Sequence, residues 1–509
     1  MGRALDRRTT VMTNRTIVAI ATFVSLVLPA IAATPVPAVR GPLPVTATSY
    51  PFGAADHTMK PEDLKAEGYV EEEFLISGTA NVYDWTKLGP ATVRAANAPY
   101  TTRVLVRRPI NRAKFSGIVA VEMLNPSNRF DLNIGWALSH KEFVRNGDAW
   151  VGITAKPIAV DALKIFNPER YKDLSWANPV PLSDPRNCAM VANDSQRTTE
   201  NGLVWDINTQ TGAWLKSRDK SNPLLYGAGP NAVHPIQHLY AWGFSQTGGF
   251  LATYANAIHP LDVQANGKPM FDAYLIGTPV IATSINQCAG PIPQGDPRWQ
   301  VHDTGVPVIR VMTTSDYLLA IKARQPDSDT ATEKFRNYEL AGAAHATPDE
   351  LYFAAAPADI VKAGREVPPM NCQEGPRSRF PSSLGFNAAW RALDDWVRRG
   401  IPAPHAEPVR VENGKPVLDE FGNLTGGVRS PFVDVPTATW TGSSTGASFC
   451  FIAGHETPVD PARLKKLYPD HKTYQRQVAA NVAKLVKDRW IVKADGDELI
   501  AEAKKAPIP

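Results

Sequence analysis

One serine of this chain stands in a glycine-rich turn, Gly243-Phe-Ser-Gln-Thr-Gly-Gly249, of the kind that can present a hydroxyl for nucleophilic attack. A strand-like apolar run, His238 to Trp242, precedes the turn, and a helix-like run, Phe250 to Ala257, follows it. A sharp turn between strand and helix would lift Ser245 above the sheet edge, over the free N–H groups of the helix. We therefore predict that Ser245 is a nucleophile and that the N–H of Gln246 is one oxyanion donor.

The turn departs from the usual Gly-x-Ser-x-Gly spacing, because Thr247 stands where the second glycine is expected and two glycines follow it. A Gly-x-Ser-x-x-Gly string arises by chance in about one in ten chains of this length, given ordinary residue usage. The alternative is a glycine-rich turn that carries a surface serine. A histidine and an acid at suitable places along the chain are needed to favour catalysis.

His345 is the histidine whose position suits a catalytic base. It follows a predicted strand, Lys334 to Leu340, within the sequence Gly342-Ala-Ala-His345-Ala, where small neighbours would let the imidazole reach Ser245 from a loop. The other histidines near predicted strands precede them and would lie at the opposite end of the sheet: His234, His238 and His302.

The predicted acid is Asp316, which follows the apolar run Val306 to Met312. Serine, acid and histidine then occur in the chain order of one known type of catalytic triad. A carboxylate here would hold the imidazole in one tautomer and stabilise its cation. Asp327 and Asp329 lie further along the same connection, before Lys334, and could do the same, so the choice of acid stays open.

The second oxyanion donor is expected in the loop after an early strand, Leu124-Asn-Pro-Ser-Asn128. Pro126 has no N–H, which leaves Asn125 or Ser127 as the donor, and we predict Asn125.

The elements that must position these residues alternate between strand and helix. Gly117 to Leu124 and Ala149 to Ala155 are apolar strands on either side of a segment, around Trp136, that we expect to be helical. This order predicts a parallel pair, and hence an α/β fold with a mostly parallel sheet flanked by helices. Further strands are predicted at Glu71 to Val82, Arg103 to Arg107, Gln237 to Trp242 and Phe271 to Ile276, and helices at Phe386 to Val397 and Tyr474 to Leu485.

The chain is expected to form a single domain over residues 56–509, after a Pro- and Ala-rich linker or N-terminal arm at residues 34–55. An irregular segment at about residues 158–200 is rich in proline and polar residues, and we expect it to be a cap inserted over the active site.

Several segments together resemble a bacterial group described as the "alpha/beta hydrolase domain" family, over roughly residues 70 to 500. The resemblance implies an α/β-hydrolase fold with its catalytic serine and histidine at Ser245 and His345, and it says little about substrate. The segments that carry it are Gly243 to Gly249, Arg324 to Asp329, Gly342 to Ala346, Glu122 to Asn125 and the surroundings of Cys288 and Cys372.

Residues 1–33 have the composition of a secretory signal peptide. Arginines precede an apolar run, Ile17 to Leu28, and small residues follow it near Ala32 and Ala33. The run is shorter than the roughly 20 residues that span a bilayer, so we expect cleavage, a secreted or periplasmic product and no stable membrane anchor.

The four cysteines of the exported part are Cys188, Cys288, Cys372 and Cys450. An even number in an oxidising compartment predicts two disulfides, and three pairings are possible. Their spacing does not suggest a zinc site, and we expect no metal and no cofactor. The net charge of +4 is too small to indicate nucleic acid as a partner.

The function predicted is therefore that of a serine hydrolase that cleaves small-molecule or polymeric esters through an acyl-enzyme. An acyltransferase or amidase could use the same three residues. A binding protein on a hydrolase scaffold is the non-enzymatic alternative.

Overall fold

The computed structural model describes residues 1–2, 34–188, 197–226, 236–262, 264, 266–279, 282–316 and 321–508. Contacts divide the chain into two units, Met1–Ala32 and Ala33–Pro509, and the fold is that of the second unit. The predicted signal peptide lies almost entirely outside the described residues. Within them, no helix is both long and apolar enough to cross a membrane.

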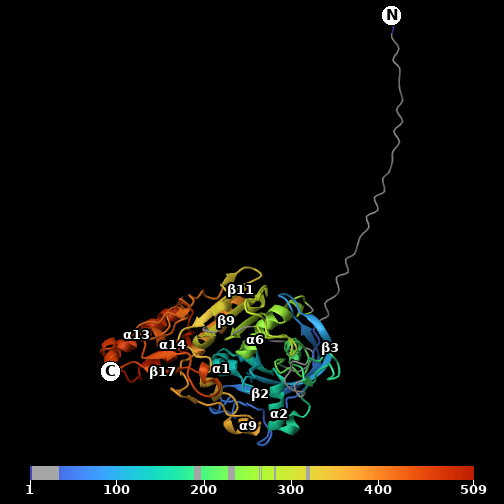
Figure 1. Ribbon diagram of the computed structural model, residues 1–509, viewed down its shortest axis with the longest axis horizontal. Helices are drawn as coiled ribbons and strands as arrows, with labels where there is room; N and C mark the ends of the chain where they lie inside the picture. Colours follow the sequence, from blue (N-terminus) through green and yellow to red (C-terminus); the bar gives the residue numbers. More distant parts are fainter. Residues whose placement is uncertain are drawn as a thin grey trace. The chain divides into compact units, whose positions relative to one another are not determined.

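A single sheet of eleven strands forms the centre of the fold (Figure 1). Its strand order is β1-β2-β3-β5-β4-β7-β8-β9-β11-β10, with β6 paired to β3. Strands β5, β4, β7, β8, β9 and β11 run parallel to their neighbours in that series, which confirms the predicted mostly parallel sheet. The strands are β1 (Ala38–Arg40), β2 (Tyr69–Asp84), β3 (Thr92–Pro109), β4 (Ile118–Leu124), β5 (Ala149–Thr154), β6 (Ser175–Trp176), β7 (His238–Phe244), β8 (Ala273–Gly277), β9 (Pro307–Thr313), β10 (Ser328–Asp329) and β11 (Lys334–Leu340).

Helices cover both faces of this sheet. On one face, Trp242 of β7 contacts Phe143 of α1 and Trp390 of α10, with ring centroids 5.8 and 5.6 Å away. On the other, Trp205 of α5 contacts Phe250 of α6. The helices are α1 (Ile134–Asn146), α2 (Pro157–Phe166), α3 (Pro168–Tyr171), α5 (Val204–Lys216), α6 (Gln246–Thr253), α8 (Asp349–Tyr352), α9 (Pro357–Lys362), α10 (Ser383–Arg399), α11 (Pro431–Asp434), α12 (Pro461–Leu467), α13 (His471–Lys487) and α14 (Lys493–Ala503).

The segment at residues 34–55 is held to the sheet by buried arginines. It supplies β1, which pairs antiparallel with β2. Arg103 donates to the carbonyl of Phe52 at 2.6 Å, and Arg107 to that of Gly53 at 3.0 Å. Arg170 donates to the carbonyl of Pro44 at 2.7 Å. Because buried charges need partners, these carbonyls supply the three guanidinium groups with hydrogen-bond acceptors in addition to their carboxylate partners.

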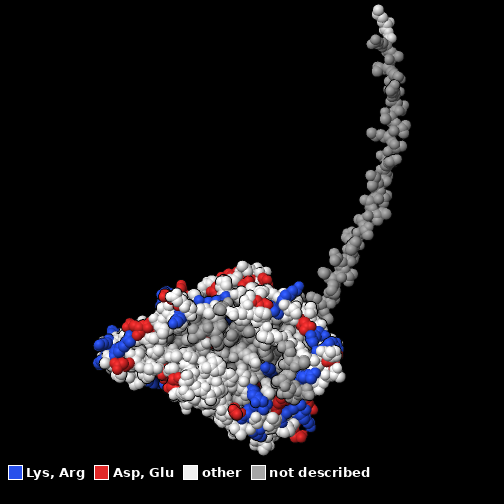
Figure 2. Space-filling view, in the orientation of Figure 1, with Lys and Arg blue, Asp and Glu red and all other residues white. Residues whose placement is uncertain are grey.

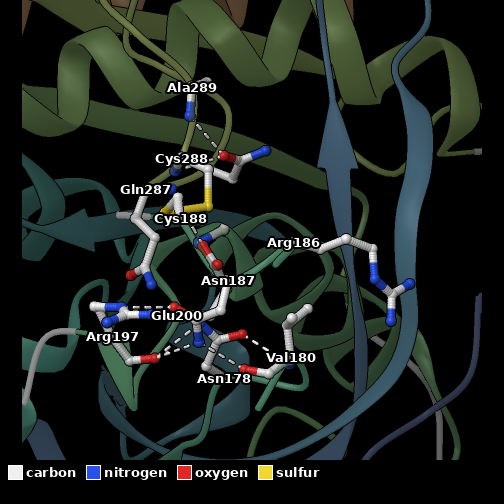
Figure 3. Close-up of a disulfide and its surroundings, with 12 residues drawn as sticks. Asn178, Val180, Arg186, Asn187, Cys188, Arg197, Glu200, Gln287, Cys288 and Ala289 are labelled. Carbon is white, nitrogen blue, oxygen red and sulfur yellow. Dashed lines mark hydrogen bonds between the residues drawn. A yellow bond between two sulfur atoms is a disulfide. The ribbon is translucent and has the colours of Figure 1, made fainter. Parts of the chain in front are cut away.

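Residues 157–188 contain both packed and irregular structure. Helices α2 and α3 and strand β6 place Phe166, Tyr171 and Trp176 in the core. Beyond them an irregular stretch leads to Cys188, which forms a disulfide with Cys288 in the loop after β8 (Figure 3). The remainder of the predicted cap includes residues 189–196, which lie outside the described part.

The C-terminal helices form a smaller apolar cluster of their own. Val478, Val482 and Leu485 of α13 pack with Leu499 of α14 and Tyr468. Two-stranded ribbons precede them in the chain: β12 (Asn371–Cys372) with β13 (Gly375–Pro376), β14 (Val411–Glu412) with β15 (Lys415–Pro416), and β16 (Ala438–Thr441) with β17 (His455–Pro458). Figure 2 shows acidic and basic side chains mixed around the rim of one face, with few of either at its centre.

Candidate active site

Ser245 occupies the strained turn that the sequence predicts between a strand and a helix. Strand β7 ends at Phe244, and α6 begins at Gln246. The backbone angles of Ser245 are φ 57° and ψ −117°, a conformation that residues other than glycine rarely adopt. Strain of this kind persists only where the surroundings impose it, and it is concentrated at functional sites.

Two of the glycines in the turn have no room for a side chain. A Cβ atom on Gly243 would lie 2.2 Å from the carbonyl oxygen of Thr247, and one on Gly248 would lie 2.3 Å from that of Gly277. Both contacts are far shorter than van der Waals distance. The turn therefore needs glycine two residues before and three residues after Ser245.

Thr247 takes the place of the expected second glycine without disturbing the turn. Its hydroxyl donates to the carbonyl of Phe244 and accepts from the N–H of Phe244, both at 3.1 Å. The side chain is completely buried. Thr247 thus closes the turn by hydrogen bonding back to the end of β7, which explains the departure from the usual spacing.

The structure brings His345 and Asp316 together. The Nδ1 atom of His345 lies 2.5 Å from Oδ1 of Asp316, and both side chains are buried. Asp316 also accepts a hydrogen bond from the hydroxyl of Thr313 at the end of β9. The histidine loop follows β11, which pairs with β9, so neighbouring strands deliver the two groups to the same edge.

The two competing acids are directed elsewhere. Asp327 and Asp329 lie 2.9 and 3.2 Å from the ring nitrogens of His405, and Asp329 also pairs with Arg336 at 2.7 Å. Of the three carboxylates weighed from the sequence, Asp316 is the one in contact with His345.

Electrostatics at His345 favour its protonated form. Burial lowers the pKa of His345, but the charge and hydrogen bond of Asp316, with a smaller contribution from Glu350, more than offset this. The net effect raises its pKa above the ordinary value. An imidazole of this kind is suited to taking up a proton during a reaction.

The two predicted oxyanion donors differ in whether their backbone N–H groups already have an acceptor. Gln246 is the first residue of α6, so its N–H has no acceptor within the helix. The N–H of Asn125 instead donates to Leu132 at 2.9 Å, and that of Ser127 to Oδ1 of Asn125 at 2.8 Å. The reason is an antiparallel bridge between Asn125 and Leu132 that closes the loop.

The side-chain amide of Asn125 faces the turn instead. It donates one hydrogen to the carbonyl of Phe244 at 2.8 Å, next to Ser245. An amide nitrogen carries two hydrogens, so a second remains to be donated.

Ser245 and His345 line one small cavity of about 20 Å³ together with Asn125, Ser127, Asn128 and Glu350. Sequence reasoning missed Glu350. It lies on α8, five residues after His345, and forms a buried ion pair of 3.0 Å with Arg377. Arg377 also contacts the carbonyl of Ala346, at 3.4 Å. The nearness of Glu350 to His345 in the sequence could have indicated it as a site residue. Its ion-pair partner, Arg377, could not be inferred, because it lies 27 positions further along the chain.

The tryptophans at positions 176, 205 and 214 are at most 2% exposed and belong to the core. In the described ranges, no group of three His, Cys, Asp or Glu side chains is arranged to hold a metal ion.

Comparison with known proteins gave one family and a set of distant structures. A family model described as "alpha/beta hydrolase domain" matches residues 39–501. No curated protein matched the sequence.

Three of the similar solved structures illustrate how distant they are. A carboxylesterase from Lactobacillus plantarum is 12% identical, with 47% of this chain and 78% of its own covered and a TM-score of 0.26. An α/β serine hydrolase without a lid from Xanthomonas campestris is 11% identical, with coverages of 52% and 84% and a TM-score of 0.24. A fungal esterase from Rhizomucor miehei is 10% identical, with coverages of 58% and 81% and a TM-score of 0.28. Similarity this low says nothing about activity.

Proposed function

The chain belongs to the alpha/beta hydrolase domain family, and from that membership we propose that it is a serine hydrolase that cleaves carboxylic esters. The observation that carries the proposal is one arrangement: Ser245 in a strained turn at the start of a helix, on the same cavity as the hydrogen-bonded pair His345 and Asp316. A serine hydroxyl is a weak nucleophile, and an adjacent base is what activates it.

In the proposed acylation step, the Oγ of Ser245 attacks the ester carbonyl carbon while Nε2 of His345 accepts the hydroxyl proton. The carbonyl oxygen becomes an oxyanion, which accepts hydrogen bonds from the N–H of Gln246 and the side-chain amide of Asn125. Collapse of this intermediate breaks the bond to the alcohol, and His345 returns the proton to the leaving oxygen. Asp316 stabilises the imidazolium while it holds the proton.

Deacylation repeats these steps with water. His345 accepts a proton from water, and the hydroxide attacks the carbonyl carbon of the acyl-enzyme. Collapse releases the carboxylic acid and restores Ser245, which regains the proton from His345. An acyltransferase or amidase would differ only in the group that enters or leaves at these steps.

The same proposal includes export. Two disulfides, Cys188–Cys288 and Cys372–Cys450, are typical of proteins in oxidising compartments. With the signal-peptide composition of residues 1–33, they support a secreted or periplasmic enzyme.

Covalent labelling tests the proposed nucleophile. Diethyl p-nitrophenyl phosphate should add one diethylphosphoryl group to the mature protein, detected by intact mass, because an activated serine attacks phosphorus and displaces p-nitrophenolate. The Ser245→Ala variant should stay unlabelled, and peptide mapping should place the group on Ser245. A folded wild-type protein that takes up no label would favour the binding-protein alternative.

A further inference from the structure

We propose that the cavity at Ser245 selects esters with a short acyl group, of about two or three carbon atoms. This inference rests on the proposed function and adds to it the substrate class and the residues that determine it. It follows from the size of the cavity, from how its walls are fixed, and from which part of an ester must remain inside.

The cavity has room for very little. Its volume is about 20 Å³, close to the space that one water molecule or one methyl group needs. Its apolar wall consists of Leu132 and Ile134 on one side and Ala346, Phe449 and Ile452 on the other. The cavity is open to solvent at its mouth, so a long acyl chain must either displace one of these sides or occupy the mouth through which the alcohol has to leave.

The first side is tied to the turn that carries the nucleophile. Leu132 and Asn125 exchange two backbone hydrogen bonds of 2.9 and 3.0 Å. The amide of Asn125 then bonds to the carbonyl of Phe244. Ile134 begins α1, whose first N–H groups donate to the buried carboxylate of Glu122, with Gly135 at 2.7 Å. Moving this side would break several buried hydrogen bonds, each costly to leave unmade.

The second side is fixed by a disulfide and by the catalytic loop itself. Phe449 and Ile452 lie in the short helix η7 (Ser448–Ile452), which also contains Cys450, bonded to Cys372 of β12. The N–H of Ala346 donates to the carbonyl of Ile452 at 3.0 Å.

Ser315 joins the same wall to the catalytic histidine. Its hydroxyl accepts from the N–H of His345 and donates to the carbonyl of Gly442, and the carbonyl of Ile452 is a second acceptor at 3.2 Å. The side that contains Ala346 and Ile452 is therefore hydrogen bonded to the residues beside His345 and Asp316, and displacing it would disturb them.

The acyl group, rather than the alcohol, is the part that must fit. It is bonded to Oγ of Ser245 from the first step to the last, so its first carbon atoms stay between these walls while water attacks. The alcohol departs after the first step and needs only a path to solvent. Ester selectivity should consequently depend strongly on acyl length and weakly on the alcohol.

The test is a series of p-nitrophenyl esters with acetyl, butanoyl and octanoyl groups, measured on the mature protein. We expect kcat/KM to be highest for acetate and at least ten-fold lower for octanoate, because overlap with a rigid wall costs free energy. An octanoate value equal to or above that of acetate would overturn the inference. Labelling of Ser245 by the phosphate ester in the same sample would show that the proposed function survives that result. Absence of both labelling and hydrolysis would overturn both proposals.

A wall variant identifies the residue responsible. Ile452→Ala removes part of the wall and should raise kcat/KM for butanoate relative to acetate by about five-fold or more. Phe451→Ala is the matched control, since Phe451 is adjacent, 57% exposed and absent from the cavity lining, and should leave the ratio unchanged. If Ile452→Ala does not fold, Ile452→Val removes one methylene and should shift the ratio in the same direction. An unchanged ratio in a folded Ile452 variant would contradict this assignment of the wall.

Discussion

The chemistry proposed at Ser245 depends on the protonation state of one imidazole. His345 can accept a proton only when neutral, and the neighbouring carboxylates Asp316 and Glu350 hold its pKa above the ordinary value despite burial. A raised pKa means that the protonated, inactive form persists to higher pH than for a free histidine.

We therefore expect kcat/KM for p-nitrophenyl acetate to fall as the pH is lowered through a midpoint above about 6.5. In Asp316→Asn, the stabilising charge is lost. The midpoint should move to lower pH and the rate should fall on the order of 10³- to 10⁴-fold, because the imidazole loses its orienting partner. A pH–rate profile of both proteins checks this, and a wild-type midpoint below about 6.5 would contradict it.

At the scale of elements, two disulfides fix irregular segments beside the sheet. Cys188–Cys288 closes a loop of 100 residues, and Cys372–Cys450 one of 78. In Figure 3, the first of these lies among hydrogen-bonded side chains, with Asn187 donating to the carbonyls of Val180 and Arg197. The second holds the cavity wall that contains Phe449 and Ile452.

Replacing either cysteine pair by alanine should lower the free energy of unfolding by about 4.5 kcal/mol, because the chain-entropy cost depends only weakly on loop length. Urea denaturation of the two double variants measures this. The two variants should differ in activity. Loss of Cys372–Cys450 should lower kcat/KM for p-nitrophenyl acetate, since it loosens the wall at Ser245. Equal kinetics in both variants would argue against that role for the wall.

The elements follow from the sequence more readily than the contacts between distant segments. Strands β7 and β9 are mostly apolar runs and β11 is a more polar one, and Ser245, Asp316 and His345 follow their ends, so local pattern and chain order suffice. The choice of Asp316 over Asp327 and Asp329 required the three-dimensional paths of the loops that follow β9 and β11. The ion pair of Glu350 with Arg377 could not be predicted, because nothing local relates two residues 27 positions apart.

At the scale of the whole molecule, the N-terminal arm is part of the folded structure. The guanidinium groups of Arg103, Arg107 and Arg170 are buried, and carbonyls of residues 44–53 are among their acceptors. Proline and alanine composition predicted a linker or an N-terminal arm, and it could not reveal acceptors that are backbone atoms. The arm also covers the edge of β2 with a short strand.

A chain that begins at residue 57 should consequently be much less stable than one that begins at residue 34. Removing the acceptors leaves buried cations incompletely paired, which costs about 3 kcal/mol or more. Thermal unfolding of the two purified proteins measures the difference. A shortened protein that unfolds at the same temperature would show that these hydrogen bonds contribute little.

The order of the cysteines in the two pairs has a consequence for biogenesis. The first cysteine bonds to the second and the third to the fourth, so neither bridge encloses the other. A thiol oxidase that joins cysteines as they emerge one after another makes the native pairs directly. For the exported chain that we propose, we therefore expect maturation to require oxidation alone, without an isomerase to reshuffle mispaired bridges.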